Sequence, residues 1–175
     1  MTQSVRSVWG TGWGIGALCG FLGFSLFVLA LHVVRPELQI TTVAVSYYVH
    51  GPHGGWLTVA LVCLGLGSLA LTLLLRRTLH VRGAGLVRWS VGLWSICVLL
   101  AAAFPADPSG RWSEPPAPAG LIHGVAALVG FLALPLAALA LAWGLGGDPD
   151  WREAGKHLLL TSALVAARLW ADREG

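Results

Sequence analysis

The sequence predicts an all-α integral membrane protein, a single-domain bundle of about five transmembrane helices over residues 1–175. Of the 175 residues, 56% are hydrophobic and only 11% are charged, whereas a soluble domain carries charge on roughly a quarter of its residues. Long apolar runs recur along the chain, and the connectors between them are too short to form a separate soluble domain. Such a chain cannot cover a surface that faces water, so we expect the bundle to be embedded in lipid.

Each predicted span contains roughly the 20 residues needed to cross the hydrocarbon core. The first four occupy residues 14–34, 56–75, 84–104 and 119–143. A fifth, over residues 156–170, is shorter and carries Arg168 close to its end. This segment either crosses completely, with the long Arg168 side chain reaching the membrane interface, or is the start of a helix that the end of the sequence cuts short.

The distribution of basic residues predicts the orientation of these spans. Most Lys and Arg residues fall on the side of the N-terminus: Arg6, Arg76, Arg77, Arg82, Arg88, Arg152 and Lys156. Because cytoplasmic connectors carry the excess of positive charge, the N-terminus is predicted to be cytoplasmic and the first and third connectors to face outward. Basic residues at helix ends reflect topology, so we expect membrane lipids as partners and no nucleic acid.

Small residues recur at every fourth position near the start of the first span, at Gly12, Gly16 and Gly20. A stripe of this kind lets another helix approach closely. It predicts packing within the bundle or, alternatively, a homo-oligomer formed through the three glycines.

Polar side chains gather on the predicted outer side. They come from the end of the first span, the first connector, the third connector and the start of the fourth span: His32, Ser46, His50, His53, Asp107 and His123. In a membrane each of these groups needs a partner or an aqueous cavity. We therefore expect them to meet at one end of the bundle.

Three segments of this outer region carry a family resemblance: a serine and tyrosine pair at Ser46 and Tyr47, Phe104-Pro105-Ala106-Asp107, and Leu121-Ile122-His123-Gly124. Together they make the chain resemble the bacterial membrane family known as domain of unknown function 998. The resemblance extends from the first helix to the fifth. It implies a multi-pass protein of a bacterial plasma membrane and no particular activity.

The outer polar residues permit several functions. We favour a non-catalytic protein, without a bound cofactor, that binds lipid or a partner or supports an assembly. In such a protein Asp107 caps the following turn, and His123 hydrogen-bonds to that carboxylate or to a carbonyl. The alternative is a lipid-modifying enzyme with His123 as general base, Asp107 as its orienting group and Ser46 as nucleophile, so whether the protein is an enzyme stays open.

Two cofactor hypotheses use the same region. A zinc site would recruit His50, His53, Asp107 and His123, which are ligand types that catalytic zinc uses. A bis-histidine haem for electron transfer would use His32 and His123 from facing helices.

Overall fold

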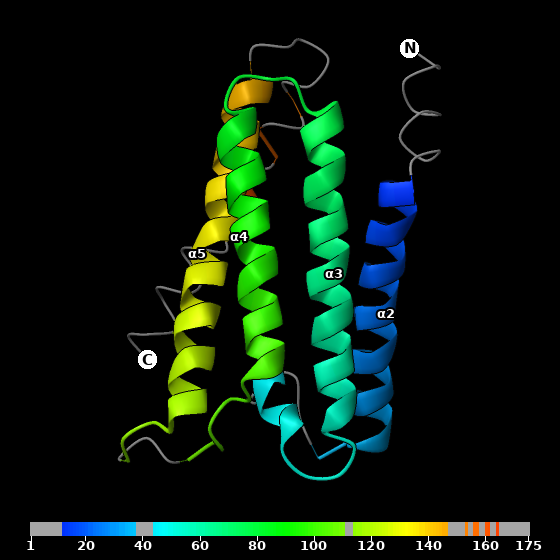
Figure 1. The fold of residues 1–175 in the computed structure, drawn as a ribbon, viewed down its shortest axis with the longest axis vertical. Coiled ribbons are helices and arrows are strands. Elements are labelled where there is room, and N and C mark those ends of the chain that lie inside the picture. The colour runs from blue at the N-terminus through cyan, green and yellow to red at the C-terminus, as the bar shows by residue number, and fades with distance from the viewer. Residues whose placement is uncertain are drawn as a thin grey trace.

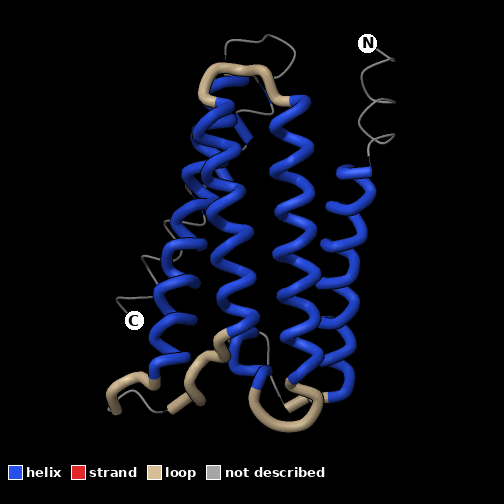
Figure 2. Tube along the Cα trace, in the orientation of Figure 1, coloured by secondary structure: helices blue, strands red, loops and turns tan. Residues whose placement is uncertain are grey.

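The computed structural model describes residues 12–37, 44–110 and 114–146, with six separate positions between 153 and 164. Four long helices lie side by side and run alternately in opposite directions (Figure 1). A short 3₁₀ helix, η1, comes between the first two long helices in the chain and lies at one end of the bundle (Figure 1). The described elements, in chain order, are α2 (Gly12–Val34), η1 (Val45–Val49), α3 (Gly55–Thr78), α4 (Ala84–Ala103) and α5 (Pro118–Leu145). In the described ranges the regular structure is entirely helical (Figure 2).

The all-α, multi-pass prediction is confirmed. The four long helices are each long and apolar enough to cross a membrane, and their bounds lie within three residues of the first four predicted spans. The fifth predicted span, 156–170, falls mostly outside the described residues. The described positions there, from Glu153 to Leu164, are helical.

The outward surfaces of the bundle are apolar, as lipid contact requires. Large side chains on the two outermost helices are more than half exposed, among them Leu26, Leu29 and Val33 on α2 and Leu128, Phe131 and Leu132 on α5. In water an apolar surface of this extent would favour aggregation or association. In a bilayer the same surface faces hydrocarbon, so the chain is a multi-pass membrane protein.

Local chemistry explains where the helices begin and end. α2 ends one residue before the Arg35-Pro36 pair, because the residue before a proline avoids the helical region. Gly83 connects α3 to α4 with a φ of 80°, which lies in the left-handed region that glycine adopts at no steric cost. α5 begins at Pro118, whose missing N–H is harmless in the first turn.

The glycine stripe of α2 lies largely against α3. A Cβ added to Gly20 would lie 2.5 Å from the Cα of Gly67 and 2.6 Å from the carbonyl oxygen of Cys63, so the two backbones are in direct contact there. A Cβ on Gly16 would meet Ala70 at 3.4 Å, whereas Gly12 has open space around it. Packing within the chain therefore occupies two of the three glycines, and association of two chains through the stripe stays a prediction.

The alternating helices separate the connectors into two groups. The α3–α4 connector and the end of α5 lie at the end of the bundle where α2 begins, and the η1 region and the α4–α5 connector lie at the other (Figure 1). At the first end the Arg82 guanidinium lies over the Trp143 ring, 4.4 Å from its centroid. The predicted outer polar residues all come from the opposite end, which we call the η1 end.

Candidate functional site

The η1 end is closed by a cap whose centre is Tyr48. This side chain is fully buried, together with Leu31 of α2 and Leu57 of α3. Its hydroxyl lies 2.9 Å from Nε2 of His32, whose Nδ1 lies 2.7 Å from the carbonyl oxygen of Val28. A carbonyl only accepts, so Nδ1 donates and Nε2 of the neutral ring accepts from the tyrosine hydroxyl. Both nitrogens of His32 are thus used inside the protein, and neither is left for a haem iron.

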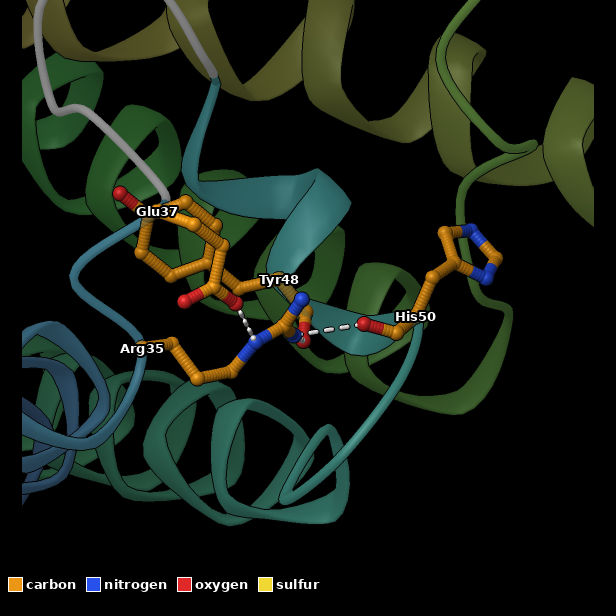
Figure 3. A network of polar contacts seen from close by, with 4 residues as sticks. All are labelled: Arg35, Glu37, Tyr48 and His50. Carbon is orange, nitrogen blue, oxygen red and sulfur yellow. Dashed lines mark hydrogen bonds and ion pairs between the residues drawn. The ribbon is translucent and has the colours of Figure 1, made fainter.

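Arg35 joins the end of α2 to η1 (Figure 3). Its guanidinium is buried and donates from Nε to Oε1 of Glu37 at 2.9 Å, and from Nη1 to the carbonyl oxygens of Tyr48 at 3.2 Å and His50 at 2.6 Å. The hydrogen bond from Arg35 holds the pKa of Glu37 below its ordinary value of 4.5. Carbonyl oxygens at the end of η1 therefore find their partner in one planar, permanently charged side chain.

His50 carries the connection onward to the α4–α5 connector. Its Nε2–H donates to the carbonyl oxygen of Ala106 at 2.8 Å. Arg35, η1 and His50 thus form a continuous chain of hydrogen bonds from α2 to the connector that precedes Asp107.

Asp107 lies at the N-terminus of α5. Its Oδ2 accepts the backbone N–H of Ala117 at 3.1 Å, and the carboxylate lies so close to Gly120 that a Cβ on that residue would overlap it. A negative charge at this position interacts favourably with the free N–H groups and the positive end of the helix dipole. Asp107 therefore caps the helix that follows it.

His123 lies one turn further along α5 and is 9% exposed. Its Nδ1 lies 2.9 Å from the carbonyl oxygen of Phe104 and 3.2 Å from that of Ala101, both at the end of α4. Because both neighbours are acceptors, Nδ1 carries the proton and satisfies carbonyls that the end of α4 leaves without helical partners. The ring thus locks α5 to α4 and leaves Nε2 as the acceptor nitrogen.

Ser46, Asp107 and His123 line one cavity at the η1 end, with a volume of about 510 Å³. Its wall also includes Glu114 and the proline segment that leads into α5. Asp107 and His123 do not hydrogen-bond to each other; in the described residues each is held by main-chain atoms instead. We call this space the polar cavity.

A second cavity, of about 370 Å³, adjoins the first, and we call it the apolar groove. It is lined mainly by hydrocarbon and aromatic side chains from all four long helices, including Phe24, Leu61, Trp94 and Phe131. Ser46, His123 and Ala127 line both cavities. A polar chamber and an apolar groove therefore meet at these three residues.

The residues of the zinc hypothesis are not brought together. His53 packs its ring against Trp56, with 4.9 Å between centroids, while His50 and His123 donate to main-chain carbonyls. Among the described residues, which include all four proposed ligands, no group of three or more His, Cys, Asp or Glu side chains is placed to hold a metal ion. The four side chains thus do not converge on one point, although Asp107 and His123 line the same cavity.

Sequence reasoning missed three contributors to this site. Arg35 pairs with Glu37, and an arginine two residues before a glutamate at a helix end is a sequence signal for such local pairing. Gly120, in the first turn of α5, makes room for the Asp107 carboxylate. Ala127 lies where the two cavities join, and nothing in its sequence context distinguishes it from the other alanines of α5.

Comparison with curated protein sequences and with solved structures gives no match for this chain. A family model described as "Protein of unknown function (DUF998)" matches residues 17–172, a range that includes η1, α3, α4, α5 and most of α2. Since this match covers most of the chain, the protein belongs to the DUF998 family of proteins of unknown function.

Proposed function

We propose that this protein binds a membrane lipid, without chemically changing it, at the η1 end of the bundle. The observation that supports the proposal is the junction of the polar cavity with the apolar groove at Ser46, His123 and Ala127. A lipid has the same division, because its headgroup needs polar partners and its chain needs apolar walls. At about 510 and 370 Å³, both spaces lie in the range of roughly 300–1,000 Å³ that small-molecule sites occupy.

The setting of this function is a bacterial plasma membrane, with the η1 end facing outward. The first part is what the sequence resemblance to a bacterial membrane family implies. The second part is supported by the position of Arg76, Arg77, Arg82 and Arg88, which lie around the α3–α4 connector at the other end of the bundle. The positive-inside rule places that end in the cytoplasm, and the binding site would then open at the outer leaflet.

The hydrogen bonds favour binding over catalysis. A Ser-His-Asp enzyme needs its carboxylate on the histidine Nδ1–H, where it orients the ring and stabilises the imidazolium. Here main-chain carbonyls take the Nδ1–H of His123, and Asp107 accepts from Ala117. A lipid-modifying enzyme is the alternative, because Ser46 and His123 do line the same cavity.

Lipid retention by an Ala127→Phe variant tests the proposal. The new ring would occupy the place where the two cavities join, while the control Val125→Phe places the same ring at an outward, 54% exposed position two residues earlier on α5. Wild-type and Val125→Phe proteins, purified in mild detergent, are expected to carry stoichiometric lipid by native mass spectrometry. Ala127→Phe should carry several-fold less with an unchanged thermal unfolding temperature.

Two results would contradict lipid binding: a wild-type protein without lipid, or equal retention by a folded Ala127→Phe variant. The same samples, incubated with excess phospholipid, separate binding from catalysis. A cleaved or transferred product that disappears in Ser46→Ala would favour the enzyme over the binding protein.

A further inference from the structure

The acceptor nitrogen of His123 has no hydrogen-bond partner among the residues that the structure describes. With Nδ1–H held by the carbonyls of Phe104 and Ala101, the neutral ring presents a lone pair at Nε2. Among the described residues no donor is hydrogen-bonded to that nitrogen, and the nitrogen is not fully buried. His123 lines both cavities, so Nε2 is the atom of this residue that remains to accept a hydrogen bond from a molecule bound there.

Two carboxylates in the polar cavity also accept hydrogen bonds. The carboxylate of Asp107 is acceptor-only, and in the described part of the chain just one of its oxygens, Oδ2, has a hydrogen-bonded partner. Glu114 adds a second carboxylate to the wall of the polar cavity. No Lys or Arg is found among the described residues that line either cavity. Besides the two carboxylates, the described lining offers the hydroxyls of Ser46 and Tyr47, which can both donate and accept.

We infer that the lipid at this site is recognised through hydrogen-bond donors on its headgroup, either an ammonium or hydroxyl groups. The inference rests on the proposed lipid-binding function and names the class of lipid. Donors pair with the lone pairs of His123 Nε2 and Asp107, whereas a headgroup without donors would leave these acceptors desolvated and unpaired. Since His123 also lines the apolar groove, the recognised donor lies close to the boundary between headgroup and chain.

A competition among three phospholipids with identical acyl chains tests this. Full-length protein in detergent is mixed with equimolar phosphatidylethanolamine, phosphatidylglycerol and phosphatidylcholine, and bound lipid is counted by native mass spectrometry. Phosphatidylcholine differs from phosphatidylethanolamine by three methyl groups that replace the N–H donors. We expect phosphatidylethanolamine to be retained about tenfold over phosphatidylcholine, the ratio that one charge-assisted hydrogen bond produces.

Two conservative variants connect this preference to the named atoms. In His123→Asn the amide N–H can still donate to the carbonyls at the end of α4, but no atom remains at the Nε2 position. The amount of bound phosphatidylethanolamine should fall toward that of phosphatidylcholine, so the donor preference should approach unity. Asp107→Asn keeps an oxygen for the Ala117 N–H and removes the charge, so it should weaken an ammonium headgroup more than the hydroxyl-bearing phosphatidylglycerol.

The outcomes separate the inference from the function on which it rests. If no lipid of any class is retained, the proposed binding function fails. If lipid is retained but phosphatidylcholine competes equally, or if a folded His123→Asn keeps the full preference, binding stands and donor recognition is overturned.

Discussion

Replacing Gly120 by alanine tests whether the Asp107 carboxylate is held against the first turn of α5. The new Cβ would overlap the carboxylate, which lies at the flexible end of its side chain. The carboxylate would therefore rotate away and lose the N–H of Ala117. Gly124, one turn later on the same helix, is the matched control, since a Cβ there meets no atom within 4 Å.

The expected difference follows from these contacts. Removing a capping side chain costs about 0.5–2 kcal/mol, and we expect about 1–2 kcal/mol here because the cap is a charged carboxylate. Alanine also gains roughly 0.5–1 kcal/mol over glycine inside a helix. That gain applies to both variants and cancels in their difference. Gly120→Ala should thus be less stable than Gly124→Ala by about 1–2 kcal/mol, which is a factor of roughly 5–30 in the folded-to-unfolded ratio.

Unfolding in mixed micelles, followed by the fluorescence of the nine tryptophans, measures this difference. Repeating both variants in an Asp107→Ala background completes a double-mutant cycle. The gap between the two alanine variants should close there, because the overlapping carboxylate is gone. Equal stability of the two variants in the presence of Asp107, or a gap that survives its removal, would refute the placement of the carboxylate on α5.

Two further predictions concern the other contacts of the bundle. Gly20→Ala brings a Cβ within 2.5–2.8 Å of α3 backbone atoms, so the helices must separate at a cost of about 1–3 kcal/mol of stability. Gly12→Ala, which places its Cβ in open space, should leave stability unchanged. Equal unfolding midpoints for the two variants would contradict the close packing of α2 on α3. The Arg35–Glu37 pair should respond to acid, because the pKa of Glu37 is lowered by the hydrogen bond from Arg35. Its stabilising effect is present above pH 4.5 and is lost as the pH falls through the lowered value. Glu37→Gln should differ from wild type at neutral pH and converge with it in acid, and a difference that does not change with pH would count against the pair.

Much of the candidate site could be expected from the sequence, but its bonding could not. Polar residues next to apolar runs are recognisable as a group, and alternating spans bring the first and third connectors to the same end. The choice of partner is different, because a hydrogen bond depends on atomic separations of a few tenths of an ångström. The residue types of Asp107 and His123, and their expected place at the same end of the bundle, suggest a catalytic pair. In the structure each of them bonds to main-chain atoms at a helix end.

The four described membrane spans and the separation of the two ends were determined by the sequence alone. A bilayer of fixed thickness requires about 20 apolar residues per crossing, so hydropathy is sufficient to place each helix. Which helix faces meet follows instead from how the helices pack in three dimensions. Helix packing places Gly20 on Gly67, buries Arg35 among carbonyls that lie 13 and 15 residues away in the chain, and joins the polar cavity to the apolar groove at His123. These contacts depend on the rotation and separation of neighbouring helices, which the apolar character of each helix does not specify.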